Sequence, residues 1–182
     1  MHPGKLVRGI RRVALKLGVR VYENSAMTRL ERTTPRVHTA GGSILAGRVV
    51  LTMNAWSTRF PELRSAILVI ASDDAMTAPA PELLERIGYK ARPLMNDSQL
   101  FVTGCRTTFD HRFTPGITGG VIGFGGLGSN RFEGRSLRED VIRDSVRRGH
   151  PALAELPFID SWYGPIDRTR SGLPLLDRKS VV

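Results

Sequence analysis

The chain has 182 residues, of which 41% are hydrophobic and 24% are charged, which is the composition of a globular protein and argues against intrinsic disorder. Its 27 basic and 17 acidic residues give a net charge of +10, but the arginines are dispersed and no aromatic-interleaved basic motif occurs, which argues against a nucleic-acid partner. No apolar run of about 18 residues and no signal-peptide pattern is found, so we expect a cytoplasmic protein with no membrane partner.

The first part of the chain predicts one helix and several strands. Apolar residues recur at helical spacing over residues 3–17, and Gly18 suits the position after the helix. Residues 19–22 have the composition of a strand, and a hairpin is expected around Gly41 and Gly42. The unbroken apolar run at 49–53 predicts a strand that is covered on both faces in a parallel sheet.

The pattern changes after Pro61, and we expect a domain boundary near residue 60. Residues 62–160 predict a mixed, largely antiparallel sheet with flanking helices, giving an α+β fold class overall. The expected strands are 66–70, 99–105 and 120–124, and the expected helices are 81–87 and 136–148. Ser136 and Glu139 have the spacing of a capping box at the start of the second helix.

Residues 123–128 match the pattern G-x-G-x-x-G but do not favour a dinucleotide site. That reading requires a helix that begins inside the motif, so that its first N–H groups point at phosphate. The residues after the motif have no apolar periodicity, and the first convincing helix begins only at Ser136. A glycine-rich strand end, approached closely by another backbone or a ligand, is the favoured interpretation.

The cysteine and the histidines give no catalytic or metal site. The single cysteine, Cys105, excludes an internal disulfide, fits a reducing compartment, and lies in a strand-like run that favours a buried apolar role. Its use as a nucleophile would need a nearby base, which the sequence does not place. The four histidines lack metal-ligand spacing and are expected to be polar surface residues. The catalytic residues therefore stay unknown.

Two segments, 49–57 and 162–174, carry a resemblance to a known family. The first is an apolar strand that ends in a small-residue loop and Trp56, and the second is an aromatic-Gly-Pro turn, a polar strand and a Gly-Leu-Pro corner. Together they resemble FAD-dependent oxidoreductases of the D-amino-acid oxidase type, especially the glycine-oxidase-like and gamma-glutamylputrescine-oxidoreductase-like members. The resemblance implies three regions: a partial FAD-binding α/β region at 1–60, a substrate region at 61–162, and a partial return to the FAD-binding region at 163–182.

The resemblance also implies a cofactor, a substrate class and site residues. FAD is the implied cofactor, and a small-molecule amine or amino acid is the implied substrate. The implied cofactor contacts are seven residues: Met27, Asn54, Ala55, Trp56, Gly172, Leu173 and Pro174. Arg168 is the implied substrate-binding residue, because a guanidinium matches a carboxylate bidentately. In the putrescine-type branch, however, Arg168 would instead pair with Asp167 or lie at the flavin edge.

Two family features are missing from this sequence. No glycine-rich phosphate-binding turn precedes Met1, and Asp177 stands where the family usually has glycine. We therefore expect a fragment of an FAD-dependent flavoprotein oxidoreductase that would oxidise an amine or amino acid by hydride transfer. On its own, we expect this chain not to retain FAD and to be inactive. The alternative is a non-catalytic chain, either a truncated relic or a subunit that completes a flavoprotein with a complementary Rossmann polypeptide.

Overall fold

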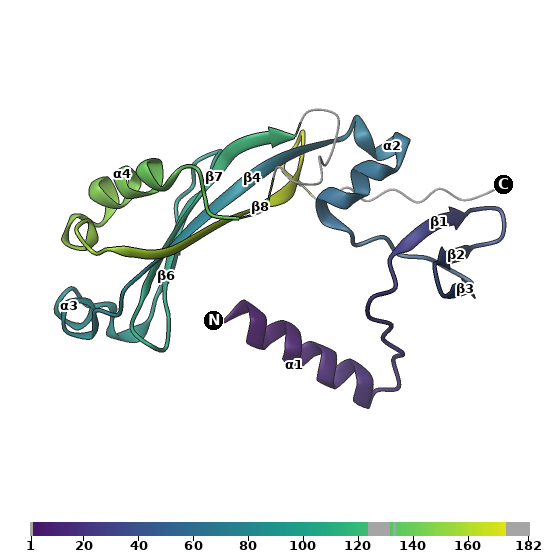
Figure 1. The fold of residues 1–182 in the computed structure, drawn as a ribbon, viewed down its shortest axis with the longest axis horizontal. Coiled ribbons are helices and arrows are strands. Elements are labelled where there is room, and N and C mark those ends of the chain that lie inside the picture. The colour runs from purple at the N-terminus through teal and green to yellow at the C-terminus, as the bar shows by residue number, and fades with distance from the viewer. Residues whose placement is uncertain (1, 124–131, 133, 174–182) are drawn as a thin grey trace. The chain divides into compact units, whose positions relative to one another are not determined.

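The computed structural model describes residues 2–123, 132 and 134–173, and its contacts divide them into two units. The N-terminal unit contains the described residues up to Thr52, and the sheet unit contains those from Met53 onward (Figure 1). The division lies between Thr52 and Met53, ahead of the boundary expected near residue 60. The assignment of the three regions to FAD and substrate stays a prediction.

The N-terminal unit consists of a helix and a small antiparallel sheet. Helix α1 (Pro3–Lys16) confirms the predicted helix, and Gly18, at a φ of +82°, follows it. The strands β1 (Met27–Glu31), β2 (Arg36–Thr39) and β3 (Gly42–Leu45) pair in chain order, which confirms the predicted hairpin. No described residue of this unit is buried, so the unit has no core of its own.

Two predicted strands of this part of the chain are wrong. Residues 19–22 and 49–53 form no strand, and the described chain offers neither segment a pairing partner. The apolar run at 49–53 was expected to be covered on both faces, but the side chain of Val50 is 82% exposed. An apolar run alone does not make a strand, because the strand also requires a neighbour that accepts its backbone hydrogen bonds.

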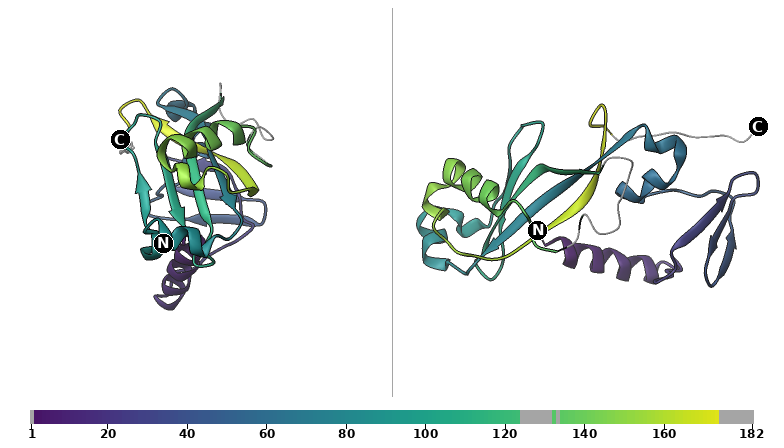
Figure 2. Two further views of the ribbon diagram at one scale, coloured as in Figure 1. Left: turned by 90° about the vertical axis from the view of Figure 1, so that its left-hand side faces the viewer. Right: turned by 45° about the horizontal axis from the view of Figure 1, so that its top comes forward.

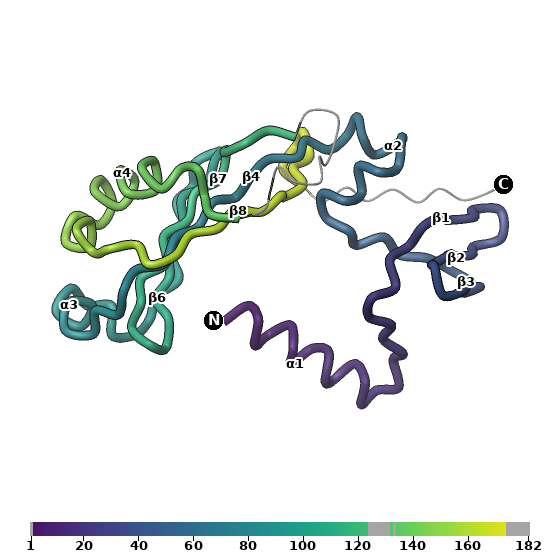
Figure 3. The backbone as a smooth tube through the Cα atoms, viewed as in Figure 1, coloured from purple at the N-terminus to yellow at the C-terminus, as the bar shows by residue number. Residues whose placement is uncertain are grey.

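The sheet unit is built on five antiparallel strands in the order β5-β6-β7-β4-β8, which confirms the expected fold class (Figures 1 and 2). Their bounds are β4 (Ile67–Thr77), β5 (Leu94–Asn96), β6 (Thr103–Thr107), β7 (Phe113–Gly123) and β8 (Phe158–Thr169). The two long strands β4 and β8 pair along their whole lengths, as the backbone trace in Figure 3 shows. Strand β4 runs well past the predicted 66–70 and includes Asp73 and Asp74.

Short helices surround this sheet. The 3₁₀ helix η1 (Asn54–Arg59) and helix α2 (Pro61–Arg64) precede β4. Helix α3 (Pro81–Arg86) confirms the short helix predicted there and is followed by Gly88 at a φ of +84°. The 3₁₀ helix η2 (Tyr89–Ala91) precedes β5, while α4 (Glu139–Gly149) and the 3₁₀ helix η3 (Pro151–Leu153) precede β8.

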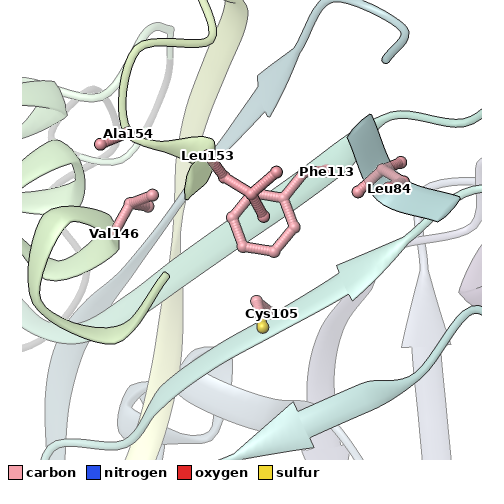
Figure 4. Close-up of a cluster of buried hydrophobic side chains, with 6 residues drawn as sticks. All are labelled: Leu84, Cys105, Phe113, Val146, Leu153 and Ala154. Atoms are coloured by element: carbon pink, nitrogen blue, oxygen red, sulfur yellow. The ribbon is translucent and has the colours of Figure 1, made fainter. Parts of the chain in front are cut away.

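The sheet has a first face, defined here as the face on which α3, α4 and η3 pack. Successive strand residues point to opposite faces, so alternate residues of β4 belong to it: Val69, Ala71, Asp73, Ala75 and Thr77. The largest cluster on this face joins Cys105 and Phe113 of the sheet to Leu84, Val146, Leu153 and Ala154 (Figure 4). Phe113 and Leu153 are completely buried, which makes this face the core of the unit.

The start of α4 is fixed by a polar network on the first face, and not by the predicted capping box. The hydroxyl of Ser136 accepts the N–H of Arg138 at 3.0 Å and donates to Asp73 at 2.7 Å. Glu139 does not reach back to Ser136 directly, because Ser161 lies between them. The hydroxyl of Ser161 accepts the N–H of Ser136 at 3.1 Å and donates to the carboxylate of Glu139 at 2.5 Å. The cap therefore depends on a residue of β8.

Candidate functional site

The second face of the sheet, opposite the first, carries the polar groups that the core does not use. Directly paired residues of antiparallel strands share a face. In β4 and β8 the second face therefore contains the pairs Leu68 with Arg168, Ile70 with Ile166, Ser72 with Gly164, and Asp74 with Trp162. In β6 and β7 it contains Gly104 paired with Gly116. The three core clusters take no side chain from these pairs.

Asp74 is the most distinctive group of the second face. Its carboxylate is half-buried and makes no hydrogen bond or ion pair with any residue that the structure describes. One carboxylate oxygen lies over Gly116 of β7, where any Cβ atom would be far inside van der Waals contact. Glycine at position 116 therefore makes room for the carboxylate to lie against the sheet.

Burial sets the electrostatics of Asp74. Desolvation raises the pKa of its carboxyl above the usual value, Arg106 acts in the opposite direction, and the charge of Asp73 adds to the increase. Asp73 is its neighbour in sequence but lies on the first face, where its side chain is 3% exposed and 3.6 Å from Arg138. Asp74 makes no comparable contact with a described residue, although Arg106, on the same face, acts on it through its charge.

An aromatic side chain and a row of glycines border Asp74. Trp162 lies directly opposite it on β8 and is 37% exposed. On the other side, Gly116 and Gly104 follow across β7 and β6, and the amide of Asn96 lies over Gly104 in the same way that Asp74 lies over Gly116. This part of the second face is therefore a low floor bordered by one carboxylate, one amide and one indole. Arg106, two positions along β6 from Gly104, lies on the same face.

The loop predicted to contact the cofactor is anchored to β8. Asn54, at a φ of +50°, accepts the N–H groups of Ala55 at 2.7 Å and Asp167 at 2.8 Å, and its amide donates to the carbonyl of Pro165 at 3.3 Å. Ala55 is completely buried, while the side chain of Trp56 is 44% exposed. The structure therefore brings η1 and the end of β8 together, with Trp56 as the outward-facing member.

The other predicted site residues lie at two places. Arg168 is on the second face near the end of β8, and it forms no ion pair with Asp167 or with any other residue that the structure describes. Gly172, at a φ of +73°, and Leu173, 67% exposed, follow that strand. Met27 belongs to the N-terminal unit, and Pro174 lies outside the described residues, as does most of the glycine-rich motif at 123–128.

A thiol and an imidazole meet on the first face, but their protonation is unsuited to nucleophilic catalysis. The sulfur of Cys105 lies 3.4 Å from Nε2 of His150, whose Nδ1 lies 2.7 Å from the hydroxyl of Tyr89. Burial raises the pKa of the Cys105 thiol to about 11 and lowers that of His150. Both groups are held neutral, whereas an active thiol needs a depressed pKa.

His150 itself departs from the expected surface position. Its ring is half-buried and packs edge-on against Phe113, with ring centroids 5.4 Å apart. A histidine followed by proline at a helix end gave no sign of this packing. Among the described residues, no group of three His, Cys, Asp or Glu side chains is arranged to hold a metal ion. Likewise, no helix in the described part of the chain has the length and hydropathy needed to cross a membrane.

The whole chain, residues 1–182, matches the family model of the FAD dependent oxidoreductases. The chain belongs to this family, which confirms the resemblance seen in the two segments at 49–57 and 162–174. The fold of the sheet unit, with its antiparallel strands and flanking helices, agrees with that membership. No curated protein sequence matches the chain.

Several solved structures share the fold. Glycine oxidase from Geobacillus kaustophilus is 20% identical with a TM-score of 0.62, over 90% of this chain and 41% of that one. A modified fructosyl peptide oxidase from Aspergillus nidulans is 15% identical with a TM-score of 0.63, over 91% and 44%. Fructosamine oxidase from Aspergillus fumigatus is 19% identical with a TM-score of 0.62, over 87% and 39%. The chain thus spans less than half the length of each of these enzymes.

Because FAD is the cofactor of this family, residues that contact it must have side chains free to touch a flat ring system. Trp56 and Leu173 are exposed, and no described atom would lie within 4 Å of a Cβ atom at Gly172, so these three fit contact with a flat ring system. The side chain of Asn54 is used by its bonds to β8, and Ala55 is buried. Both residues shape the loop that presents Trp56. Among the described residues, those free to make the predicted cofactor contacts therefore lie at the junction of η1 and β8.

Sequence reasoning missed Asp74. The signal was present, because two consecutive aspartates interrupt an apolar stretch at positions 73 and 74. Aspartate is depleted in strands, so the pair favoured a strand end at Ile70 instead of a continuous strand. Only the observed pairing of β4 with β7 and β8 shows that the two carboxylates leave the sheet on opposite faces.

Proposed function

We propose that this chain is the substrate-facing part of an FAD-dependent oxidoreductase that oxidises a small amine or amino acid in the cytoplasm. The observation that carries the proposal is the second face, where a half-buried, unpartnered carboxylate lies beside Trp162 on the same sheet surface as Arg168. In a surface used only for packing, such a carboxylate would be bonded to a partner or replaced by an apolar side chain, because an uncompensated buried charge is unfavourable. The glycine oxidase and fructosamine oxidase folds support the substrate class.

In this proposal, FAD supplies the redox chemistry when it is bound, by accepting a hydride from the carbon that bears the amine. The residues of this chain orient the substrate and shield it from water. Trp56, Gly172 and Leu173 would contact the cofactor at the η1 and β8 junction, with Met27 and Pro174 as further predicted contacts. The pyrophosphate would be held by a Rossmann-type segment, which a complementary polypeptide could supply.

The test is purification of the affinity-tagged chain from its native cells, followed by absorption spectroscopy under anaerobic conditions. We expect a flavin spectrum, and we expect it to bleach on addition of an amine or amino acid. A preparation without flavin would contradict the proposal. A flavin spectrum that no amine or amino acid bleaches would support the non-catalytic alternative, in which the chain is only a structural subunit of a flavoprotein.

A further inference from the structure

We propose that Asp74 binds the ammonium group of a cationic amine substrate, above the floor formed by Gly104 and Gly116 and next to Trp162. The inference rests on the proposed function and narrows its substrate class. It depends on the direction in which Asp74 points, on its lack of a partner, and on the residues that surround it.

The first step is that Asp74 has no hydrogen bond or ion pair with a described residue, although the charge of Arg106 acts on it. Asp73, one residue earlier, is bonded to Ser136 and lies 3.6 Å from Arg138, so it holds α4 to the sheet. Asp74 bonds to nothing among the described residues, although it is half-buried. A half-buried carboxylate without a partner has a strong preference for a cation that brings its own hydrogen-bond donors.

The second step is the shape of the surroundings. The glycines at 104 and 116 leave the sheet surface low beside the carboxylate, and neither could carry a Cβ atom without displacing Asn96 or Asp74. Trp162 stands directly opposite Asp74, at the distance over which paired side chains of neighbouring strands interact. An indole is the aromatic side chain that attracts cations best, so carboxylate and ring act on the same group.

The third step concerns the kind of cation. A metal ion needs several ligands, and among the described residues Asp74 belongs to no group of three His, Cys, Asp or Glu side chains that could hold one. An ammonium needs fewer protein contacts, because water can take its remaining donors. Arg168 lies on the same face but is paired with Leu68, six positions along β4 from Asp74, which is roughly 20 Å at the rise of a strand. Asp74 and Arg168 therefore do not hold the two ends of one α-amino acid.

The experiment follows the two indole N–H signals of the ¹⁵N-labelled full chain, with butylammonium as the probe and butyrate and butanol as controls of equal length. The signal of Trp162, assigned with a Trp162→Phe variant, is expected to shift saturably with butylammonium alone, while the signal of Trp56 stays in place. Asp74→Asn should weaken this binding by roughly tenfold or more. Asp144→Asn, which changes an exposed aspartate of α4, should leave it unchanged.

Equal shifts in Asp74→Asn and the unaltered chain, or equal shifts with butyrate, would overturn the inference. If Asp74→Asn does not fold, the unaltered chain is titrated instead between about pH 4 and 8, where the amine stays protonated. Binding must then strengthen as Asp74 loses its proton under the influence of Arg106 and Asp73, and a flat profile would overturn the inference. The measurement needs no flavin, so its outcome is independent of whether the chain retains FAD.

Discussion

Asp73 and Asp74 are adjacent in sequence and chemically identical, yet the sheet gives them opposite surroundings. Asp73 leaves β4 on the first face, is 2% exposed, and joins Ser136 and Arg138 in the network that begins α4. Asp74 leaves on the second face and has no described partner. The first carboxylate is a structural group, and the second is available to a ligand. The difference shows that strand alternation, and not residue type, decides which of the two carboxylates is bonded within the protein.

The largest effect should come from removing the structural carboxylate. Asp73→Ala leaves the guanidinium of Arg138 and the hydroxyl of Ser136 without their partner, and we expect a loss of about 2–4 kcal/mol in the free energy of unfolding. Denaturant unfolding followed by circular dichroism measures it. The control is Asp74→Ala, which breaks no bond among the described residues. If both variants lost the same stability, the contrast between the two faces would be wrong.

A glycine behind Asp73 should show a smaller effect of the same kind. A Cβ atom at Gly120 would collide with the buried carboxylate of Asp73 and lie 3.1 Å from the guanidinium of Arg138. Gly120→Ala should therefore cost about 1–3 kcal/mol of unfolding free energy, in the range of other overpacked cores. Gly164→Ala is the matched control, because a Cβ atom there meets no described atom within 4 Å. A Gly120→Ala protein as stable as this control would mean that the pair can move aside.

Several elements of both units could be predicted from the sequence, whereas the site could not. Local patterns such as the apolar spacing in α1, the glycines of the β2 and β3 hairpin and the short helix at α3 gave those elements nearly correctly. The strand predictions for residues 19–22 and 49–53 were wrong because a strand needs a partner strand to pair with, which no local pattern reveals. The role of Ser161 in capping α4 was missed for a similar reason, because Ser161 belongs to β8, which is distant in sequence from the start of α4.

The candidate site depends even more on contacts that are distant in sequence. Trp56 and Arg168 were identified through a family resemblance, and the anchoring of η1 to β8 through Asn54 joins positions 111 and 113 residues apart. Asp74 acquires its significance only from its opposite neighbours, Gly116 on β7 and Trp162 on β8. The pairing register of the strands therefore determines the neighbours of Asp74, which composition and residue spacing do not reveal.

The pH dependence of stability should distinguish Asp74 from the other carboxylates. Its pKa is raised in the folded state, mainly by desolvation, so the folded chain holds this proton more tightly than the unfolded chain does. The contribution of Asp74 is then fully present below the unfolded pKa and is lost as the pH rises through the folded pKa. Asp74→Asn should therefore be slightly more stable than the unaltered chain at neutral pH and gain nothing at low pH. Unfolding curves at several pH values measure this difference, and the opposite trend would show an unrecognised partner for the carboxylate.

The smallest effect on stability is expected at the far end of the second face. Arg168 makes no ion pair with a described residue, so Arg168→Ala should change the free energy of unfolding by less than about 0.5 kcal/mol. Because Arg168 and Asp74 are separated by six positions along the strand, the variant should also leave the butylammonium shift of Trp162 intact. In a flavin-containing preparation, however, it should weaken bleaching by any substrate that carries a carboxylate, because such a group would lose its guanidinium partner. Unchanged bleaching by carboxylate and amine substrates alike would remove Arg168 from the site and leave Asp74 as the one charged group of the second face with a proposed ligand.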